Sequence, residues 1–199
     1  DVVVLVLDAQ EGPSVQEKKI AAMVEKEQKG CLILVSKWDL AEGVTTQREY
    51  GAALREALPF LGHVPVLFVS AQSGYNMRRS IEAIDYVGEQ VRSVLTTGAL
   101  NRLLHSAFER TPPPVKDGKR LKFFYATQVG TQPVRIKLFV NHPRRLVSHY
   151  KAYLVNTLRG AFGLEGAPVI LHFAPRHEER KGTRQTKQSF RQRRPRRKR

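Results

Sequence analysis

Short apolar runs, each followed by a polar segment with helical spacing, dominate the first half of the chain. They predict strands at Val2–Leu7, Cys31–Ser36 and Val64–Ala71. Each run has the length of a strand and is bounded by turn residues, which is typical of a parallel sheet, and we expect Val2–Leu7 to be buried on both faces. The alternation of strands with helices indicates crossover connections and an α/β fold.

The polar segments between these strands carry helix signals. Ser14 with Glu17, and Thr46 with Glu49, have the spacing of a capping box. Gly74 precedes a third, longer amphipathic segment. The apolar residues that we expect to face the core are Ile20, Met23 and Val24 in the first helix, Tyr50, Leu54 and Leu58 in the second, and Met77, Ile81, Ile84, Val91 and Leu95 in the third.

The second half has a different order of elements. The expected elements are a helix at Ala99–Arg110, antiparallel strands at Leu121–Val129 and Val134–Val140, a helix from about Val147 and a strand at Val169–Phe173. In the first of these strands, Leu121, Phe123, Tyr125 and Thr127 are expected on one face and Lys122, Phe124, Ala126 and Gln128 on the other. The outer face of the strand pair is expected to be edged with basic residues.

Charge varies along the chain. The formal net charge is +16; residues 1–97 carry 10 basic and 13 acidic residues, residues 98–175 carry 12 and 3, and residues 176–199 carry 12 and 2. We therefore expect an α/β part over 1–97, a basic α+β domain over 98–175, and over 176–199 a disordered basic tail with too few apolar residues to fold alone. The last two parts suit a polyanionic partner, whereas the first does not.

Composition argues against several classes of protein. The single cysteine, Cys31, cannot form an internal disulfide and suits a reducing cytosol. No apolar run approaches the roughly 18 residues that span a bilayer, and there is no signal peptide. None of the six histidines has the spacing of a metal site. Because a strand begins directly at Val2, we expect the chain to start within a domain.

Polar residues follow the second strand at the edge where parallel sheets bind ligands. The Asp39 carboxylate could accept two parallel N–H bonds from guanine, through its ring N1–H and its amino group, whereas adenine offers no matching pair. Lys37 could lay its alkyl stem along the ring. For an isolated S-K-x-D the alternative, a strand end that meets water, is favoured. The segment Ser70-Ala71 after the third strand shifts the balance toward a nucleotide site.

Ser36-Lys37-Trp38-Asp39 followed by Ser70-Ala71 resembles the guanine-recognition pair [NT]-K-x-D and S-A-x of small GTP-binding proteins. The resemblance implies that Asp39 bonds the guanine ring, Lys37 stacks over it, and the backbone N–H of Ala71 meets the guanine carbonyl. Ser36 stands where the family usually has Asn or Thr. Its tie to the phosphate-binding loop is therefore expected to be weaker or made through water.

Two other elements of such proteins are missing. No G-x-x-x-x-G-K-[ST] loop occurs, and neither does the element that senses the terminal phosphate. In the GTPase fold both precede the strand represented by Val2–Leu7. We therefore expect the C-terminal half of a P-loop GTPase sheet that binds GTP or GDP, with the Mg²⁺ ligands outside this chain and no GTP hydrolysis by the chain alone.

The order helix, strand, strand, helix, strand on a basic surface resembles a KH-type RNA-binding fold, which usually clamps single-stranded RNA with a G-x-x-G loop. Gly160 to Gly163 has this spacing, but it falls where a helix ends, so we interpret both glycines as C-caps. The basic residues predicted to contact RNA are Lys119, Arg120, Lys122, Arg135, Lys137, Arg144 and Arg145.

Both halves together resemble the bacterial tandem-domain GTPases called EngA or Der. The resemblance rests on S-K-W-D-L and S-A joined to P-P-P-x-x-x-G-K-R-L-K-F-F-Y-A-T-Q-V and L-F-V-N-H-P. It implies a cytoplasmic GTPase that binds the large (50S) ribosomal subunit and its rRNA late in assembly. The alternative is a non-enzymatic RNA-binding or ribosome-associated module whose α/β half is a scaffold without nucleotide. The tail either adds phosphate contacts or is a solubilising end.

Overall fold

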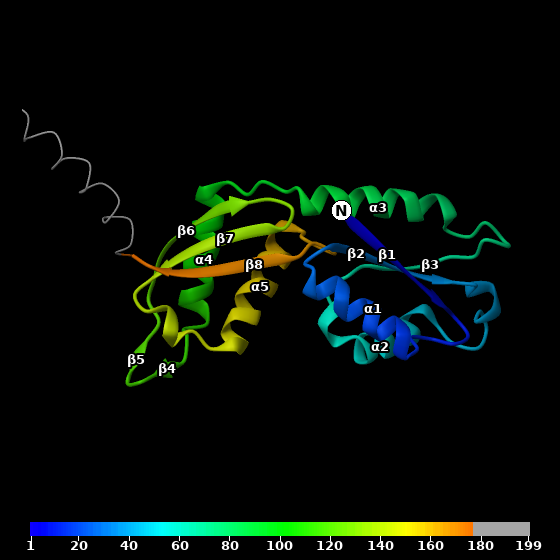
Figure 1. Ribbon diagram of the computed structural model, residues 1–199, viewed down its shortest axis with the longest axis horizontal. Coiled ribbons are helices and arrows are strands. Elements are labelled where there is room, and N and C mark those ends of the chain that lie inside the picture. Colours follow the sequence, from blue (N-terminus) through cyan, green and yellow to red (C-terminus); the bar gives the residue numbers. More distant parts are fainter. Residues whose placement is uncertain (177–199) are drawn as a thin grey trace, which may run out of the picture.

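The computed structural model describes residues 1–176, so the predicted tail lies outside the described residues except for Arg176. The first unit is a parallel sheet with the order β1-β2-β3. Its elements are β1 (Val2–Asp8), α1 (Val15–Lys26), β2 (Gly30–Ser36), η1 (Trp38–Leu40), α2 (Gln47–Ala57), η2 (Pro59–Leu61), β3 (Val66–Phe68) and α3 (Met77–Val91). The α/β fold with a parallel sheet is therefore confirmed (Figure 1).

Helices cover both faces of this sheet. In Figure 1, α3 lies on one side of the three strands, and α1 and α2 lie on the other. One buried cluster joins the sheet to α1 and α2 through Leu5, Leu7, Ala21, Val24, Ile33, Val35, Leu54 and Leu58. On the opposite face, Val87 and Val91 of α3 pack in a cluster with Leu32. Successive residues of a strand point to opposite faces, so β2 contributes to both clusters.

Several apolar residues expected in the core are exposed. Val6 on β1 is 55% exposed, and Met23 on α1 and Ile81 on α3 are each 63% exposed. The prediction that Val2–Leu7 is buried on both faces is wrong at Val6, because β1 lies at the edge of this sheet. In α1 the buried stripe runs through Ala21 and Val24. A surface helix buries only one arc of its circumference, and residue size alone does not show which arc.

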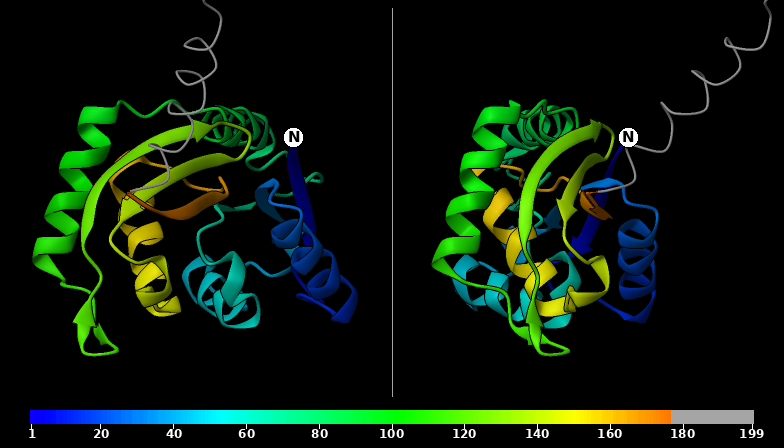
Figure 2. Two further views of the ribbon diagram at one scale, coloured as in Figure 1. Left: turned by 60° about the vertical axis from the view of Figure 1, so that its left-hand side comes forward. Right: turned by 90° about the vertical axis from the view of Figure 1, so that its left-hand side faces the viewer.

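The second unit packs two helices on one face of a three-stranded sheet. Its elements are α4 (Thr97–Arg110), β4 (Val115–Lys116), β5 (Lys119–Arg120), β6 (Phe123–Gly130), β7 (Val134–Val140), η3 (Pro143–Arg145), α5 (Ser148–Phe162) and β8 (Val169–Pro175). β6 and β7 are antiparallel, as predicted, and β8 runs parallel to β7. In Figure 1 the strands of this sheet lie in front of α4 and α5, with no described helix over their front face, and Figure 2 shows the same unit from two other sides. The predicted order of elements is confirmed.

A β-bulge in β6 changes the predicted alternation. The register shifts between the pairs Phe123–Val140 and Tyr125–Phe139. Beyond the shift Ala126 belongs to the core, whereas Tyr125 does not. The expectation that Phe123 and Tyr125 share one face of the strand is therefore wrong. One extra residue in a strand moves all later side chains to the opposite face, which a two-residue period does not reveal.

Gly163 ends α5 with a left-handed backbone, at φ +66°, and its N–H donates to the carbonyl of Arg159. This confirms the interpretation of Gly163 as a C-cap. Gly160 lies inside α5, so the same interpretation is wrong for that residue. The helix continues to Phe162, which packs against the buried cluster of the second unit.

The two units share one hydrophobic core. A single buried cluster contains Leu32 and Val91 of the first unit together with Leu100, Leu138 and Leu154 of the second. Two backbone hydrogen bonds also join the units. The N–H of Cys31 donates to the carbonyl of Gly166 over 2.9 Å, and the N–H of Gly166 donates to the carbonyl of His63 over 3.1 Å. The core therefore continues across the boundary expected near residue 98.

Candidate functional site

The segment after β2 is fixed by a buried tryptophan. Trp38 is almost fully buried, with its ring centroid 4.4 Å from that of Phe68 and 5.8 Å from that of Tyr50. Lys37 has a left-handed backbone, at φ 54°, which is costly for a residue with a side chain and is often retained at ligand sites. Trp38 therefore holds Lys37 and Asp39 on either side of it at the carboxyl end of the sheet.

The segment after β3 lies beside it. The N–H of Val69 donates to the carbonyl of Val35 over 2.8 Å, and the N–H of Trp38 donates to the carbonyl of Val69 over 3.1 Å. Ser70 is buried: its N–H donates to the carbonyl of Tyr75, and its hydroxyl accepts the N–H of Ser73. The structure thus brings the two predicted segments, 36–39 and 70–71, next to each other.

Two polar groups in these segments have no partner within residues 1–176. The Asp39 carboxylate makes no hydrogen bond and no ion pair there. The exposed Ala71 offers a backbone N–H that donates no hydrogen bond there. An acceptor pair and a single donor therefore stand at adjoining positions of one sheet edge. This is the pattern that complements a ring with two neighbouring N–H groups and a carbonyl.

Lys37 has a partner that the sequence did not predict. Its Nζ lies 2.7 Å from Oδ2 of Asp8, the last residue of β1. The hydrogen bond from Lys37 lowers the pKa of Asp8, and the same contact raises the pKa of Lys37. Asp8 pairs with Ser36 in the register of β1 and β2. An acid at the carboxyl end of the neighbouring predicted strand was the available signal for this pair.

Ser36 bonds within the sheet. Its hydroxyl donates to the carbonyl of Leu7 on β1 over 2.9 Å. The bond holds the carboxyl ends of β1 and β2 together, so Ser36 positions the loop and its hydroxyl proton is not available to a ligand in this arrangement. Neither Leu7 nor Asp8 was among the predicted site residues.

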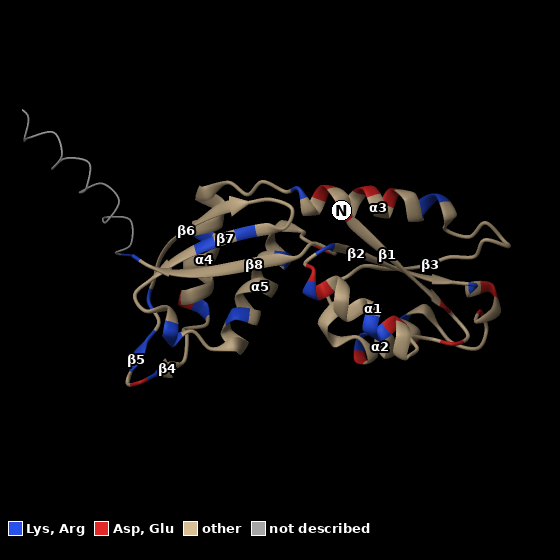
Figure 3. Cartoon of the chain, in the orientation of Figure 1, with Lys and Arg blue, Asp and Glu red and all other residues tan. Residues whose placement is uncertain are grey.

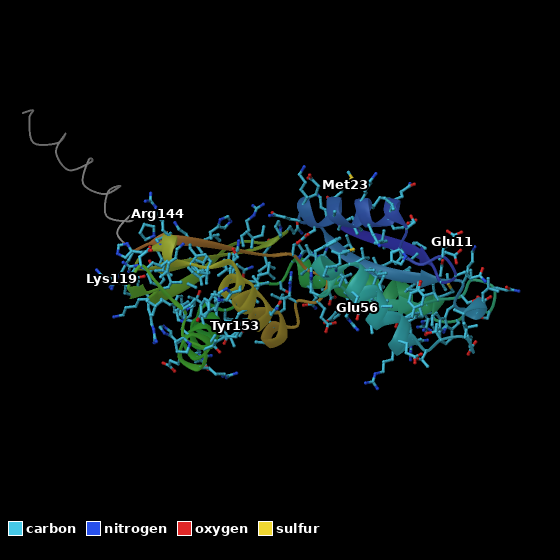
Figure 4. All side chains as sticks on the ribbon, turned by 90° about the horizontal axis from the view of Figure 1, so that it is seen from below. Glu11, Met23, Glu56, Lys119, Arg144 and Tyr153 are labelled. Carbon is cyan, nitrogen blue, oxygen red and sulfur yellow. The ribbon has the colours of Figure 1, made fainter. Side chains whose placement is uncertain are left out.

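The basic residues predicted to contact RNA fall into two groups. Five lie near the β4-β5 hairpin and η3: Lys119, Arg120, Lys122, Arg144 and Arg145. Lys116 joins these elements, because its Nζ donates to the carbonyl of Arg144 over 2.9 Å. Arg135 and Lys137 lie apart from them, on β7. Figure 3 shows both groups, and Figure 4 places Lys119 and Arg144 at one end of the molecule, far from Glu11.

Asn141 holds the first group in place. Its Oδ1 accepts the N–H of Lys122 over 2.9 Å, and its Nδ2 donates to the carbonyl of Arg120 over 3.1 Å. The side chain therefore ties the segment after β5 to the end of β7. Asn141 was not among the predicted residues, and only its place in the L-F-V-N-H-P segment could have drawn attention to it.

A cavity of about 890 Å³ lies away from the loops described above. It lies between α2 and α5 and is lined by Arg55, His63 and Arg159 among others, but by none of residues 36–39 or 70–71. Burial lowers the pKa of His63 to about 4, with the charge of Arg159 adding to the effect.

Within residues 1–176 no cluster of His, Cys, Asp or Glu could hold a metal ion. None of the helices described there is long and apolar enough to cross a bilayer.

Two family models match the chain. The model described as the elongation factor Tu GTP binding domain matches residues 1–99, and the model described as the KH-domain-like C-terminal part of EngA bacterial GTPase enzymes matches residues 95–174. Together they cover both structural units.

Curated relatives cover nearly the same stretch. GTPase Der of Caldanaerobacter subterraneus subsp. tengcongensis is 41% identical over 180 residues, which are 90% of this chain and 41% of the relative. GTPase Der of Natranaerobius thermophilus is 42% identical over 171 residues, or 85% of this chain and 39% of the relative. GTPase Der of Protochlamydia amoebophila is 39% identical over 172 residues, which are 86% of this chain and 35% of the relative. The chain thus spans about two fifths or less of these relatives' length.

A solved structure shows a weaker likeness. The crystal structure of a point variant of Aquifex aeolicus Era bound to GDP and AlF4⁻ matches 88% of this chain and 65% of its own, at 12% identity and a TM-score of 0.37. A TM-score of this size supports no argument about function.

Proposed function

Because the chain belongs to the EngA/Der family of bacterial GTPases, we propose that residues 36–39 and 70–71 bind the guanine base of GTP and GDP. The Asp39 carboxylate accepts the N1–H and the amino group of guanine, and the N–H of Ala71 donates to the guanine carbonyl. Lys37 leaves or shares its contact with Asp8 to lie along the ring. Ser36 and Ser70 hold the two loops in position through their bonds within the protein.

The proposal depends on the adjoining positions of Asp39 and Ala71 at one edge of the sheet. Both groups lack a partner within residues 1–176, and their loops are joined by the hydrogen bond from Trp38 to Val69. Adenine presents an amino group where guanine has a carbonyl, and it has no N1–H. Adenine would therefore leave the carboxylate and the amide poorly paired, which costs about 1 to 3 kcal/mol for each desolvated group.

We further propose that the complete protein hydrolyses GTP in the cytoplasm and acts in assembly of the large ribosomal subunit. The basic second unit contacts rRNA through Lys119, Arg120, Lys122, Arg144 and Arg145 at one end and through Arg135 and Lys137 on β7. Support comes from their exposure or partial exposure and from the lack of any acidic residue between Asp117 and Glu165. Such contacts to phosphates weaken steeply as salt is raised.

Mg²⁺ accompanies GTP in proteins of this kind, but the residues described here do not form a site for it. The chain also contains no G-x-x-x-x-G-K-[ST] loop. The chain as it stands is therefore assigned the base-binding part of the site, and no step of hydrolysis is assigned to its residues.

The test uses a polypeptide that supplies the phosphate contacts, made by joining the part of the Caldanaerobacter relative that precedes the matched segment to residues 1–199. Trp38, the single tryptophan of this chain, adjoins Asp39 and reports binding by fluorescence in a background whose other tryptophans are replaced by phenylalanine. We expect GDP to bind at least about 10-fold more tightly than ADP. Asp39→Asn should exchange this preference for xanthosine diphosphate, whose 2-carbonyl needs a donor.

Asp85→Asn is the matched control, because Asp85 is exposed on α3 and makes no ion pair within residues 1–176. It should leave both affinities unchanged. An Asp39→Asn variant that keeps the preference for guanine would remove Asp39 from the site. A wild-type polypeptide that binds no guanine nucleotide would instead favour the second candidate, an RNA-binding module with a nucleotide-free scaffold, for which the ion pair of Lys37 with Asp8 offers a purely structural role.

A further inference from the structure

The bulge in β6 places two consecutive aromatic residues outside the core. Phe123 faces inward, with its ring stacked 5.0 Å from Phe108 on α4. Phe124 and Tyr125, on the other side of the register shift, belong to neither buried cluster. Bulges re-aim side chains in this way and are frequent beside binding sites. The face of the sheet opposite α4 and α5 therefore gains two rings from adjacent positions.

Tyr125 covers a third ring on the same face. Ile136, Leu138 and Val140 of β7 enter the core, so the alternate residue Phe139 points to the opposite face. The rings of Tyr125 and Phe139 stack with centroids 4.3 Å apart and planes at 16°. Phe139 is only 2% exposed although it lies in neither cluster, which shows that side chains of the outer face cover it. Tyr125, which remains partly exposed, is the outer ring of this stack.

Cations surround these rings. Lys137 Nζ lies 5.0 Å from the centroid of Phe139, and the guanidinium carbon of Arg176 lies 4.9 Å from that of Phe124. Arg135 is exposed two residues before Lys137 on the same face. The three strands contain no acidic residue. Figure 3 shows basic residues along β7, and the alternation with Ile136 and Leu138, which enter the core, places them on the face away from α4 and α5.

We propose that this outer face of β6, β7 and β8 binds single-stranded RNA, with a base stacked on Tyr125 and phosphates held by Arg135, Lys137 and Arg176. The proposal rests on the proposed RNA contact of the second unit and adds its mode. Bases in a duplex are stacked on each other and cannot reach a protein ring, whereas unpaired bases can. A ring platform edged with cations is the arrangement that binds single strands with little sequence preference.

The assigned mode differs from a clamp at the glycine pair of α5. Gly163 ends α5, and Gly160 lies within the helix. The helices that flank a clamp are therefore not separated by a loop at this point. The sheet face offers both stacking and charge within one surface.

The test measures binding of the whole chain to a labelled eight-nucleotide single-stranded RNA and to a 16-base-pair RNA duplex, at about 0.3 M salt to weaken contacts made by phosphates alone. Tyr125→Leu keeps an apolar cover over Phe139 but removes the stacking ring. We expect it to weaken single-strand binding about 10-fold, within the range for loss of one stacked base, and to change duplex binding less than 2-fold. Tyr125→Phe should retain wild-type binding.

Lys137→Gln should weaken the binding of both RNAs. It should also reduce the magnitude of the slope of log affinity against log salt by about one, since it removes one phosphate contact. Tyr86→Leu is the control, because Tyr86 is a ring 40% exposed on α3 in the first unit. Circular dichroism of each variant confirms folding. Suppose that Tyr125→Leu and Tyr86→Leu both bind the single strand as tightly as the wild type, while Lys119→Gln binds it more weakly. The RNA contact of the second unit would then be supported, and the stacking of a base on Tyr125 would be refuted. If the wild-type chain binds neither RNA, the proposed RNA contact itself fails.

Discussion

Cys31 on β2 and Gly166 before β8 are in direct backbone contact, although 135 positions separate them in the chain. Gly166 has φ +69°, and a Cβ built there would lie 2.6 Å from the carbonyl oxygen of Cys31 and 3.0 Å from two methyl carbons of Val87. Only glycine therefore allows the connection between α5 and β8 to approach β2 this closely.

Gly166→Ala should destabilise the chain by about 3 kcal/mol or more. The left-handed backbone costs about 1 to 2 kcal/mol with a side chain, and the contact with a backbone oxygen adds to it because strand β2 cannot move aside. Urea unfolding monitored by Trp38 fluorescence measures the change. Gly118→Ala is the control, since Gly118 also has φ +69° but no atom within 4 Å of the added carbon. Equal decreases in the unfolding free energy of the two variants would show that the close approach of residue 166 to Cys31 has no effect.

The stability of the chain should fall in mild acid because of His63. Burial lowers its folded pKa to about 4, below the ordinary 6.5, so the unfolded state binds the proton more tightly. The unfolding free energy is then complete above about pH 6.5 and decreases by roughly 3 kcal/mol in total as the pH falls to 4. His63→Gln should remove this part of the pH dependence, measured by urea unfolding at pH 7, 5.5 and 4.5.

Charged groups line the cavities around His63. They are Glu25, Lys29, Arg48, Arg55, Lys151, Arg159 and Glu165. Arg159→Met should raise the folded pKa of His63 and flatten the profile in part, because the charge of Arg159 disfavours a protonated imidazole. His149→Gln, at an exposed residue of α5, should leave the profile as it is. A profile that His63→Gln does not alter would count against His63 as its source.

Asn101 substitutes for a missing strand partner. Its Nδ2 donates to the carbonyl of Ala126 and its Oδ1 accepts the N–H of Ala126, both over 2.8 Å, at the edge strand β6. Asn101→Ala should lower the unfolding free energy by about 2 kcal/mol, because Ala126 is fully buried and loses both partners. Asn156→Ala, at an exposed residue of α5, should change it by less than about 0.5 kcal/mol. Similar decreases in the unfolding free energy of the two variants would mean that water replaces the hydrogen bonds of Asn101 without cost.

The ion pair of Asp8 with Lys37 should give a small pH-dependent stabilisation. The folded pKa of Asp8 is lowered, so its contribution is present above about pH 4 and is lost as the pH falls through the folded value. The pKa of Lys37 is raised, so its contribution is present up to about pH 10 and lost above that. Asp8→Asn should lower stability at pH 7 and lower it less at pH 2. Denaturation midpoints at both pH values measure this, and an unchanged midpoint at pH 7 would contradict it.

Local patterns predicted the elements well because each depends on neighbours in sequence. Ser14 and Thr46 begin helices through bonds to residues two or three positions away, and the apolar runs at Val2 and Cys31 form adjacent parallel strands. The predicted site segments followed from the same logic, because loops after adjacent parallel strands meet at one edge. Asp39 and Ala71 could therefore be placed together from the sequence.

Features that depend on partners distant in sequence were missed. The burial of Ala21 in place of Met23 is decided by the neighbouring elements, and the exposure of Ile81 by what lies over that part of α3. The bulge at Phe124 depends on pairing with β7, and without it Tyr125 would face the core. The contact of Lys37 with Asp8 requires the register of two strands, whereas the position of Lys37 over a base stays a prediction. None of these relations repeats along the chain, so no periodicity reveals them.

The common cluster that holds Leu32 and Leu154 constrains how a signal could travel from one end of the molecule to the other. Sliding or hinging between the halves would pull apart close-packed side chains and admit solvent. If the proposed nucleotide and RNA sites are occupied together, nucleotide exchange near Asp39 would therefore reorient residues 1–176 as one rigid body and leave the shape of the RNA-binding face unchanged.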